Sequence, residues 1–146
     1  MLHIHEHAGR HTLNIEPEED IMAELKQFAE SNNITAAHIS GLGACGEVDL
    51  AYYNLETKEY ERTKIVEDLE ICSLNGNIGV NAAGETIVHL HGVFGRQDRT
   101  TYGGHIFECI VSGAGEIHLV AMPGTINRSY DEATGLTLMC EAANAK

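Results

Sequence analysis

The feature that most constrains this chain is a long succession of strand-like segments. In these segments apolar and polar residues alternate, or apolar residues form a continuous run. The segments are rich in Val, Ile, Leu and Tyr and are separated by glycines and polar turn residues. Short connections between consecutive strands favour an antiparallel sheet that closes or folds over on itself. The expected strands are 9–15, 34–40, 47–54, 59–66, 69–80, 86–94, 102–112 and 116–122, and a last apolar piece follows at 136–140.

One segment instead has the spacing of an amphipathic helix. Pro17 suits a first helical position, and the acidic run 18–20 suits the positive end of the helix dipole. Apolar residues follow at spacings of three and four until the polar run 31–33. We therefore predict an α+β fold, with a mainly antiparallel, strongly curved sheet of about seven or eight strands and one main helix near the N-terminus.

The chain length fits one domain. Its 146 residues contain no linker or repeat, so we expect a single domain over 1–146 with flexible ends at 1–9 and 141–146. No apolar run approaches the roughly 18 residues of a membrane span, and the start lacks the apolar stretch of a secretory signal. The expected location is cytoplasmic, away from membranes.

Charge and cysteine content exclude further classes of protein. The net charge of -13 opposes binding to nucleic acid, and the candidate for a local basic patch is Arg96 with Arg99, close together in one loop. The four cysteines are widely spaced with no Cys-x-x-Cys pair, which predicts reduced core thiols rather than a zinc–thiolate site.

Three histidines carry the most specific chemical signal. His89 and His91 are two apart in a predicted strand, so both rings project to one face. A hairpin centred on Asp98 in the polar stretch 95–101 sets His105 opposite His91. Directly opposed residues have Cβ atoms about 4.5–5.5 Å apart. The sequence therefore predicts three imidazoles on one patch of sheet, against the alternative of unrelated histidines.

Three neutral imidazoles suit a divalent metal ion, zinc first, with iron, nickel or copper as alternatives. Three protein ligands leave a position open to water or substrate, as in catalytic zinc sites. Gly103 and Gly104 beside His105 allow a ligand or another backbone to come close. Glu116 and His118 on the following strand are candidates for a fourth ligand. Arg96 and Arg99 are candidates for attracting a small anionic ligand.

Two weaker motifs have simpler interpretations. His3, His5 and His7 also alternate, but a solvated, mobile N-terminus explains them better than a second metal patch. The segment 41–46, GLGACG, matches the dinucleotide fingerprint G-x-G-x-x-G, yet a strand pattern rather than a helix follows it. We therefore interpret these glycines as a turn or bulge.

The ordered set of motifs resembles the plants-and-prokaryotes conserved (PPC) domain, from about residue 10 to residue 139. The motifs are EPEED at 16–20, ISGLGA at 39–44, AYYN at 51–54, LNGNI at 74–78, VHLH at 88–91, GGHI at 103–106 and RSYD at 128–131, followed by GL at 135–136. This resemblance implies an α+β fold assembled as a homotrimer. It also implies metal binding at the positions of His89, His91 and His105.

Three functions stay open at this point. The first is a metal-binding trimer with a small-molecule site, which has no identifiable general base and so no named reaction. The second is the DNA-binding or regulatory module of the family's usual label. The chain lacks the Arg-Gly-Arg-Pro core of the AT-hook that accompanies the plant domains. The third is a protein-interaction scaffold in which the metal is structural.

Overall fold

The computed structural model describes residues 1–141 and consists of eight strands and one helix over that part of the chain. The expected flexible end at 141–146 lies, apart from Glu141, outside the described residues. The elements are β1 (Leu2–His7), β2 (Arg10–Ile15), α1 (Ile21–Ser31), β3 (Ala37–Asn54), β4 (Glu59–Val80), β5 (Thr86–Gly95), β6 (Thr101–Ala121), β7 (Asn127–Asp131) and β8 (Leu136–Cys140).

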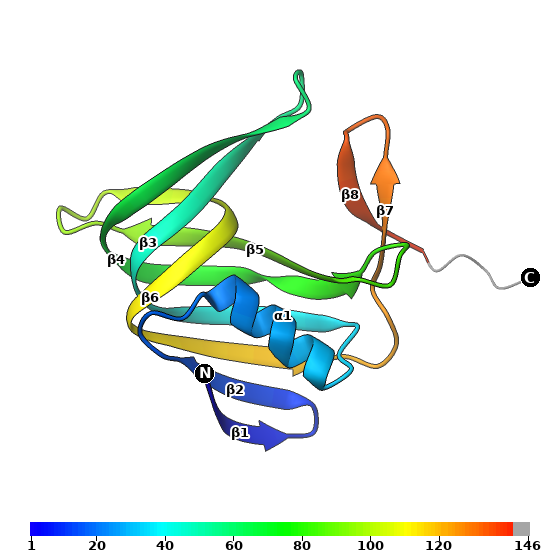
Figure 1. Cartoon of the computed structure of the whole chain (residues 1–146), viewed down its shortest axis with the longest axis horizontal. Helices are drawn as coiled ribbons and strands as arrows, with labels where there is room; N and C mark the ends of the chain where they lie inside the picture. The colour runs from blue at the N-terminus through cyan, green and yellow to red at the C-terminus, as the bar shows by residue number, and fades with distance from the viewer. Residues whose placement is uncertain (142–146) are drawn as a thin grey trace, which may run out of the picture.

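The strands form one mostly antiparallel sheet in the order β1-β2-β6-β3-β4-β7-β8. Strand β5 pairs with both β4 and β6, and β3 also pairs with both, so these four strands close on themselves. The long β3–β4 ribbon extends beyond this closure as an arm, and the β7–β8 hairpin stands at another end of the molecule (Figure 1). The predicted curvature of the sheet is confirmed.

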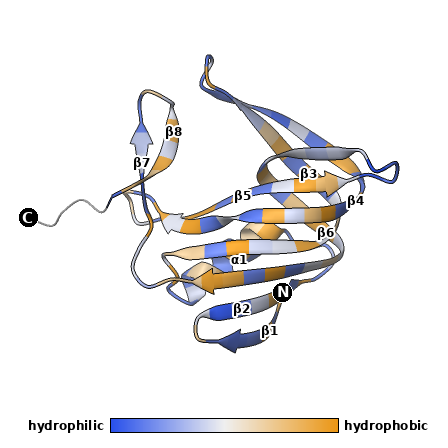
Figure 2. Ribbon diagram, turned by 180° about the vertical axis from the view of Figure 1, so that it is seen from behind, coloured by the Kyte–Doolittle hydropathy of each residue, from blue (hydrophilic) through white to orange (hydrophobic). Residues whose placement is uncertain are grey.

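Helix α1 covers one face of the sheet (Figure 1). Its predicted apolar stripe is buried at Ile21, Leu25, Phe28 and Ala29. The helix begins later than Pro17, because the Asp20 side chain caps it by accepting from the backbone N–H groups of the next turn, at 3.1 and 3.2 Å. The buried face beneath α1 includes apolar side chains from β2 to β6, and hydrophobic colour marks these strands in Figure 2.

Several strands are longer than the sequence predicts. Segments 34–40 and 47–54 join into β3, 59–66 and 69–80 into β4, and 102–112 and 116–122 into β6. The glycines between them act as bulges, since the β3 register shifts between Gly41 and Gly43 and again after Cys45. A Cβ at Gly43 would lie 2.1 Å from the Ala114 carbonyl oxygen. No helix follows GLGACG, which confirms that it is not a dinucleotide loop.

Strand pairing involves most of the first nine residues, which the sequence predicts to be a flexible end. They form the edge strand β1 and a turn into β2, with His7 opposite Arg10 and Leu2 opposite Asn14. The physical reason is that a paired backbone satisfies its hydrogen-bonding groups even where every side chain of the strand is exposed. Cys45 and Cys109 are buried thiols as expected, whereas Cys72 and Cys140 are exposed.

Among the described residues, no helix has the length and apolar character needed to cross a membrane.

Candidate metal centre

The β5–β6 hairpin brings the three predicted histidines together. His91 lies directly opposite His105, as a hairpin centred on Asp98 predicts, and the turn spans 96–100. On β5, Leu90 points into the core and is fully buried, so His89 and His91 project from the other face of the strand. Pairing with Asn77 and Asn75 of β4 fixes the register of both histidines.

The three rings form a nearly equilateral cluster. Ring centroids are 5.2 Å apart for His89 and His91, 5.1 Å for His89 and His105, and 5.3 Å for His91 and His105. Each ring offers one nitrogen, and these three nitrogens all lie within 4.8 Å of one another. The three nitrogens are therefore close enough for small side-chain rotations to bring them onto one ion.

The environment keeps two of the rings neutral. Burial lowers the pKa of His89 to about 4, with further lowering by the Arg128 charge and by His91. The pKa of His105 also falls to about 4, first through burial and then through the two other histidines and Arg128. A metal ligand must present an unprotonated nitrogen. Both rings therefore meet the protonation requirement for binding a metal at neutral pH.

Arg128 of β7 packs beside this cluster. It is only 5% exposed, and its Nη2 donates to Asn77 Oδ1 at 2.7 Å and lies 3.2 Å from His89 Nδ1. Its Nη1 donates to the Thr137 carbonyl at 3.0 Å. A guanidinium has donors only, so His89 Nδ1 accepts in this contact. Arg128 thus joins β4, β5 and the β7–β8 hairpin at the edge of the cluster.

Aromatic rings form another wall of the site. Tyr60 lies 4.9 Å from His105 and 5.1 Å from Phe107, measured between ring centroids. Burial is the main cause that raises the pKa of the Tyr60 hydroxyl, so it stays protonated. A pocket of about 310 Å³ opens between Tyr60, the cluster and β8, and its lining includes His89, His105 and Arg128.

The donor set fits a metal ion. His105 Nδ1 is buried and has no hydrogen-bond partner among the described residues, which costs free energy unless something completes the site. Three imidazole nitrogens, two of them neutral through burial, are the donors that zinc and related ions prefer. Because His91 is exposed, an ion held here would stay reachable from solvent.

The glycines around the cluster serve close backbone contacts. A Cβ at Gly104 would lie 2.8 Å from the Ala51 carbonyl oxygen, so this glycine lets β3 approach β6. A Cβ at Gly76 would lie 1.9 Å from the His89 carbonyl oxygen. Gly103 has only an ordinary contact and lines a shallow pocket of about 360 Å³ together with Gly104 and His91.

Two sets of predicted residues lie elsewhere. Arg96 and Arg99 flank the hairpin turn, and Arg96 is five residues from His91, about 17 Å of extended strand. Arg96 Nε donates to Glu67 Oε1 at 2.8 Å, in a pocket that also contains Asp68, and Arg99 donates to a turn carbonyl. The Arg96 charge is paired and the Arg99 side chain is exposed, and both lie away from the cluster within the chain.

The candidate fourth ligands are also too distant. His118 pairs with Ser40, which pairs with Asn75, which pairs with His91. Three strand spacings separate His118 from His91, about 14 Å. Glu116 lies two residues further along β6. Both residues lie outside the cluster because of how β6 pairs with β3, and the sequence does not determine that register.

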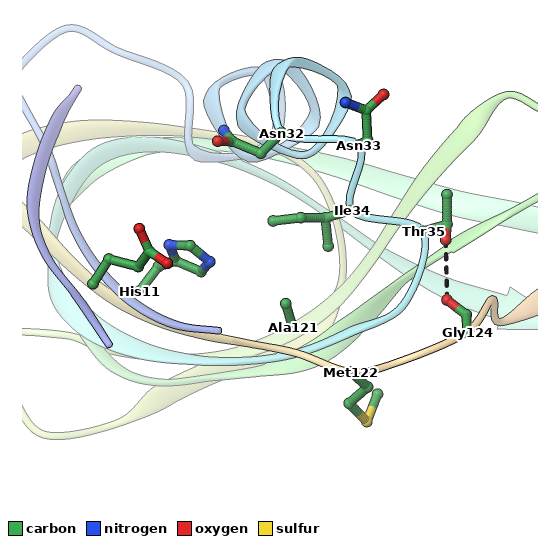
Figure 3. A pocket seen from close by; sticks show the side chains of 9 residues that line it. His11, Asn32, Asn33, Ile34, Thr35, Ala121, Met122 and Gly124 are labelled. Atoms are coloured by element: carbon green, nitrogen blue, oxygen red, sulfur yellow. Dashed lines mark hydrogen bonds between the residues drawn. The ribbon is translucent and has the colours of Figure 1, made fainter. Parts of the chain in front are cut away.

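The remaining histidines form no comparable group. His11 is 8% exposed and its Nδ1 lies 3.3 Å from His3 Nε2, so it is a packed and hydrogen-bonded residue. His11 also lines a pocket of about 440 Å³ beneath the end of α1 (Figure 3), where Thr35 donates to the Gly124 carbonyl at 3.1 Å. This pocket contains one histidine and shares no residue with the cluster.

Sequence reasoning missed Arg128, Asn77 and Tyr60 as members of the site. All three lie far from the histidines in the chain, and β7 meets β4 through a single parallel pair, Val80 with Asn127. A charged residue between apolar segments gives no signal of burial, so only the fold could find Arg128. The sequence motifs RSYD and LNGNI contain Arg128 and Asn77, but they do not indicate that these residues lie beside the histidines.

Comparisons with known proteins identify similar chains. A presumed DNA-binding protein from Bacteroides thetaiotaomicron is 30% identical, with a TM-score of 0.89 over 93% of this chain and 94% of that one. A metal-containing protein from Archaeoglobus fulgidus is 33% identical, with a TM-score of 0.86 over 97% and 99%. A plant- and prokaryote-conserved protein from Pyrococcus horikoshii is 28% identical, with a TM-score of 0.83 over 91% and 92%. None of the curated proteins matches.

The model of the Plants and Prokaryotes Conserved (PCC) domain matches residues 4–123, which include the whole three-histidine cluster. The sequence resemblance and the structural likeness to the Pyrococcus protein point to the same family. The chain belongs to the Plants and Prokaryotes Conserved domain family.

Proposed function

We propose that this protein binds a divalent metal ion through His89, His91 and His105 and leaves a coordination position for a small ligand. The observation that carries the proposal is the convergence of three imidazole nitrogens within 4.8 Å. The low pKa values of His89 and His105 support it, because these rings need no deprotonation to bind the ion at neutral pH.

Zinc is the expected ion. Imidazole nitrogens suit zinc, and a site with three protein ligands keeps an open position. A bound ion of this kind supplies Lewis acidity and lowers the pKa of bound water. The relative from Archaeoglobus fulgidus, described as metal-containing, supports a metal in this chain too. We name no reaction, because no carboxylate lines the pocket at the cluster to act as general base.

The test is the metal content of untagged protein. After exposure to zinc and removal of free ion, we expect one ion per chain in the wild type and far less in His91→Asn and His105→Asn. His118→Asn is the matched control, since it removes a histidine from the same strand as His105 but outside the cluster. A wild type that holds no ion, or variants that hold as much as the control, would contradict the proposal.

We also propose that the chain assembles as a homotrimer, as the family resemblance implies. Large apolar side chains on the β3–β4 ribbon support a partner surface, because Tyr52 and Val66 are each 71% exposed and Leu55 is 63% exposed. Sedimentation equilibrium should give three times the 15.9 kDa of one chain. A monomer at micromolar concentration would exclude the trimer and leave the metal site untouched.

DNA binding is a second candidate, favoured by the description of the Bacteroides relative. The net charge of -13 opposes it, since non-specific affinity comes from Lys and Arg neutralising phosphates. Even the Arg62 and Arg96 side chains pair with acidic residues. A gel shift at low salt should therefore give no complex with duplex DNA. A retarded band that weakens with added salt would favour this function instead.

A further inference from the structure

Among residues 1–141, the cluster and its pocket carry the positive charge of Arg128 without an acidic partner. Arg128 is the only buried Arg, Lys, Asp or Glu among residues 1–141. It forms no ion pair there, and its Nε is buried without a partner. Burying a charge without compensation is costly. In a chain with 22 acidic and 9 basic residues, a pocket lined by this arginine and by no carboxylate is an exception.

A metal ion would enlarge this imbalance. Three neutral imidazoles bring no negative charge, so a divalent ion and Arg128 together leave three uncompensated positive charges at one pocket. None of the described residues that line either pocket of the cluster is Asp or Glu. Residues 1–141 therefore place no negative charge at either pocket of the cluster.

Metal binding would also release a donor of Arg128. His89 Nδ1 accepts from Arg128 Nη2 at 3.2 Å. A histidine that binds a metal through Nε2 carries its proton on Nδ1, and one that binds through Nδ1 has no lone pair to spare. In either case His89 stops accepting from Arg128. The guanidinium keeps Asn77 and Thr137 as partners and gains a free N–H beside the pocket.

We propose that the pocket between Arg128, Tyr60 and the cluster binds a short organic carboxylate, with the guanidinium of Arg128 as its anchor. This inference rests on the proposed metal site. A planar guanidinium suits a planar carboxylate, and apolar side chains of β5 and β8 such as Ile87 and Leu136 suit a short carbon chain better than a bare inorganic ion. The volume of about 310 Å³ accommodates such a molecule.

The two ligands should favour each other. The ion raises affinity for the carboxylate by adding charge and freeing the donor of Arg128, so the carboxylate must raise affinity for the ion by the same factor. Arg128 is therefore an anchoring residue whose effect is measurable without any enzymatic assay.

The test uses the full chain loaded with zinc, butyrate as probe and the neutral butyramide as its control. We expect butyrate to shift the Arg128 Nε–H resonance of the wild type and to increase its affinity for zinc. Butyramide should change neither the resonance nor the affinity. Arg128→Gln should weaken butyrate binding by about tenfold or more, while Arg128→Lys, which keeps the charge without the planar fork, should fall between.

Arg99→Gln is the matched control, because it removes an exposed arginine of the hairpin turn and should leave butyrate binding unchanged. If Arg128→Gln does not fold, butyrate binding by Arg128→Lys and the butyrate-dependent shift of the wild-type Arg128 resonance still test the inference. A protein that takes zinc but does not respond to butyrate overturns this inference alone. A wild type that takes no zinc overturns the proposed function and this inference with it.

Discussion

Two groups of histidines alternate along strands of this molecule, and only one becomes a cluster. His3 and His5 of β1 have the same two-residue spacing as His89 and His91 of β5. In β1 the register shifts between His3 and His5, which pair with the adjacent residues Leu13 and Thr12 of β2. A bulge at Ile4 therefore turns the two side chains to opposite faces.

The β5 strand differs in two physical respects. Its pairing with β4 is unbroken from Val88 to Val93, so the side-chain alternation is preserved across both histidines. It also has a neighbour on each side, and the returning strand β6 supplies His105. Strand β1 is an edge and pairs with β2 alone. A His-x-His motif therefore indicates a site only where the strand register is regular and a second strand supplies a further ligand.

The largest expected effect separates the two groups by metal affinity. Replacing His89 and His91 together by Asn should weaken zinc binding by more than about 100-fold, because two of three ligands are lost. Replacing His3, His5 and His7 by Asn should leave stoichiometry at one ion and affinity within about twofold. Competition with a fluorescent zinc chelator measures both. A loss of zinc in the N-terminal variant, with affinity kept in the other, would mean that the ion sits at the N-terminus instead.

A second large effect should come from the backbone contact that sets the register at His89. In Gly76→Ala, the new Cβ would lie 1.9 Å from the His89 carbonyl oxygen, so β4 and β5 must separate. We expect a loss of unfolding free energy of about 3 kcal/mol, together with weaker zinc binding. Gly113→Ala is the control, since its Cβ meets only an ordinary contact at 3.5 Å. If urea denaturation gives the two variants equal stability, the close contact at Gly76 does not hold β4 and β5 in place.

The third effect is a pH dependence of the metal-free protein. The folded pKa values of His89 and His105 are about 4, below the ordinary value of 6.5, so the unfolded chain binds more protons between these limits. Stability should therefore fall as pH decreases from about 6.5 to about 4. His89→Asn/His105→Asn should flatten this part of the curve. Parallel curves for the wild type and the variant would show that neither ring is held neutral by the fold.

Local patterns account for what the sequence could predict. The β5–β6 hairpin can be predicted from the number of residues on each side of Asp98. The helix can be predicted from the spacing of apolar residues before Asn32. Both patterns lie within short segments of the sequence. The expected start of the helix at Pro17 was wrong by several residues, because Asp20 caps the helix and also accepts from the Cys109 backbone N–H at 2.9 Å. That second contact depends on a strand almost ninety residues away.

Long-range register accounts for what the sequence could not predict. Arg128 reaches His89 only because β7 joins the edge of β4, and His118 misses the cluster only because of how β6 pairs with β3. Alternating apolar patterns are unchanged when a strand slides by two residues, so they do not determine which polar side chains become neighbours. Alternating patterns also do not reveal the bulges at which two short predicted strands join into β3.

The two histidines of β1 should also differ from each other, by a small amount of stability. His3 packs its ring 5.3 Å from both His11 and Phe28, whereas His5 lies across the bulge and makes no aromatic contact among residues 1–141. His3→Ala should cost about 1 kcal/mol of unfolding free energy, and His5→Ala about 0.5 kcal/mol or less. Thermal unfolding of the two variants side by side measures the difference. Equal costs would mean that the bulge does not divide the faces of β1, because a regular strand would give both rings the same surroundings.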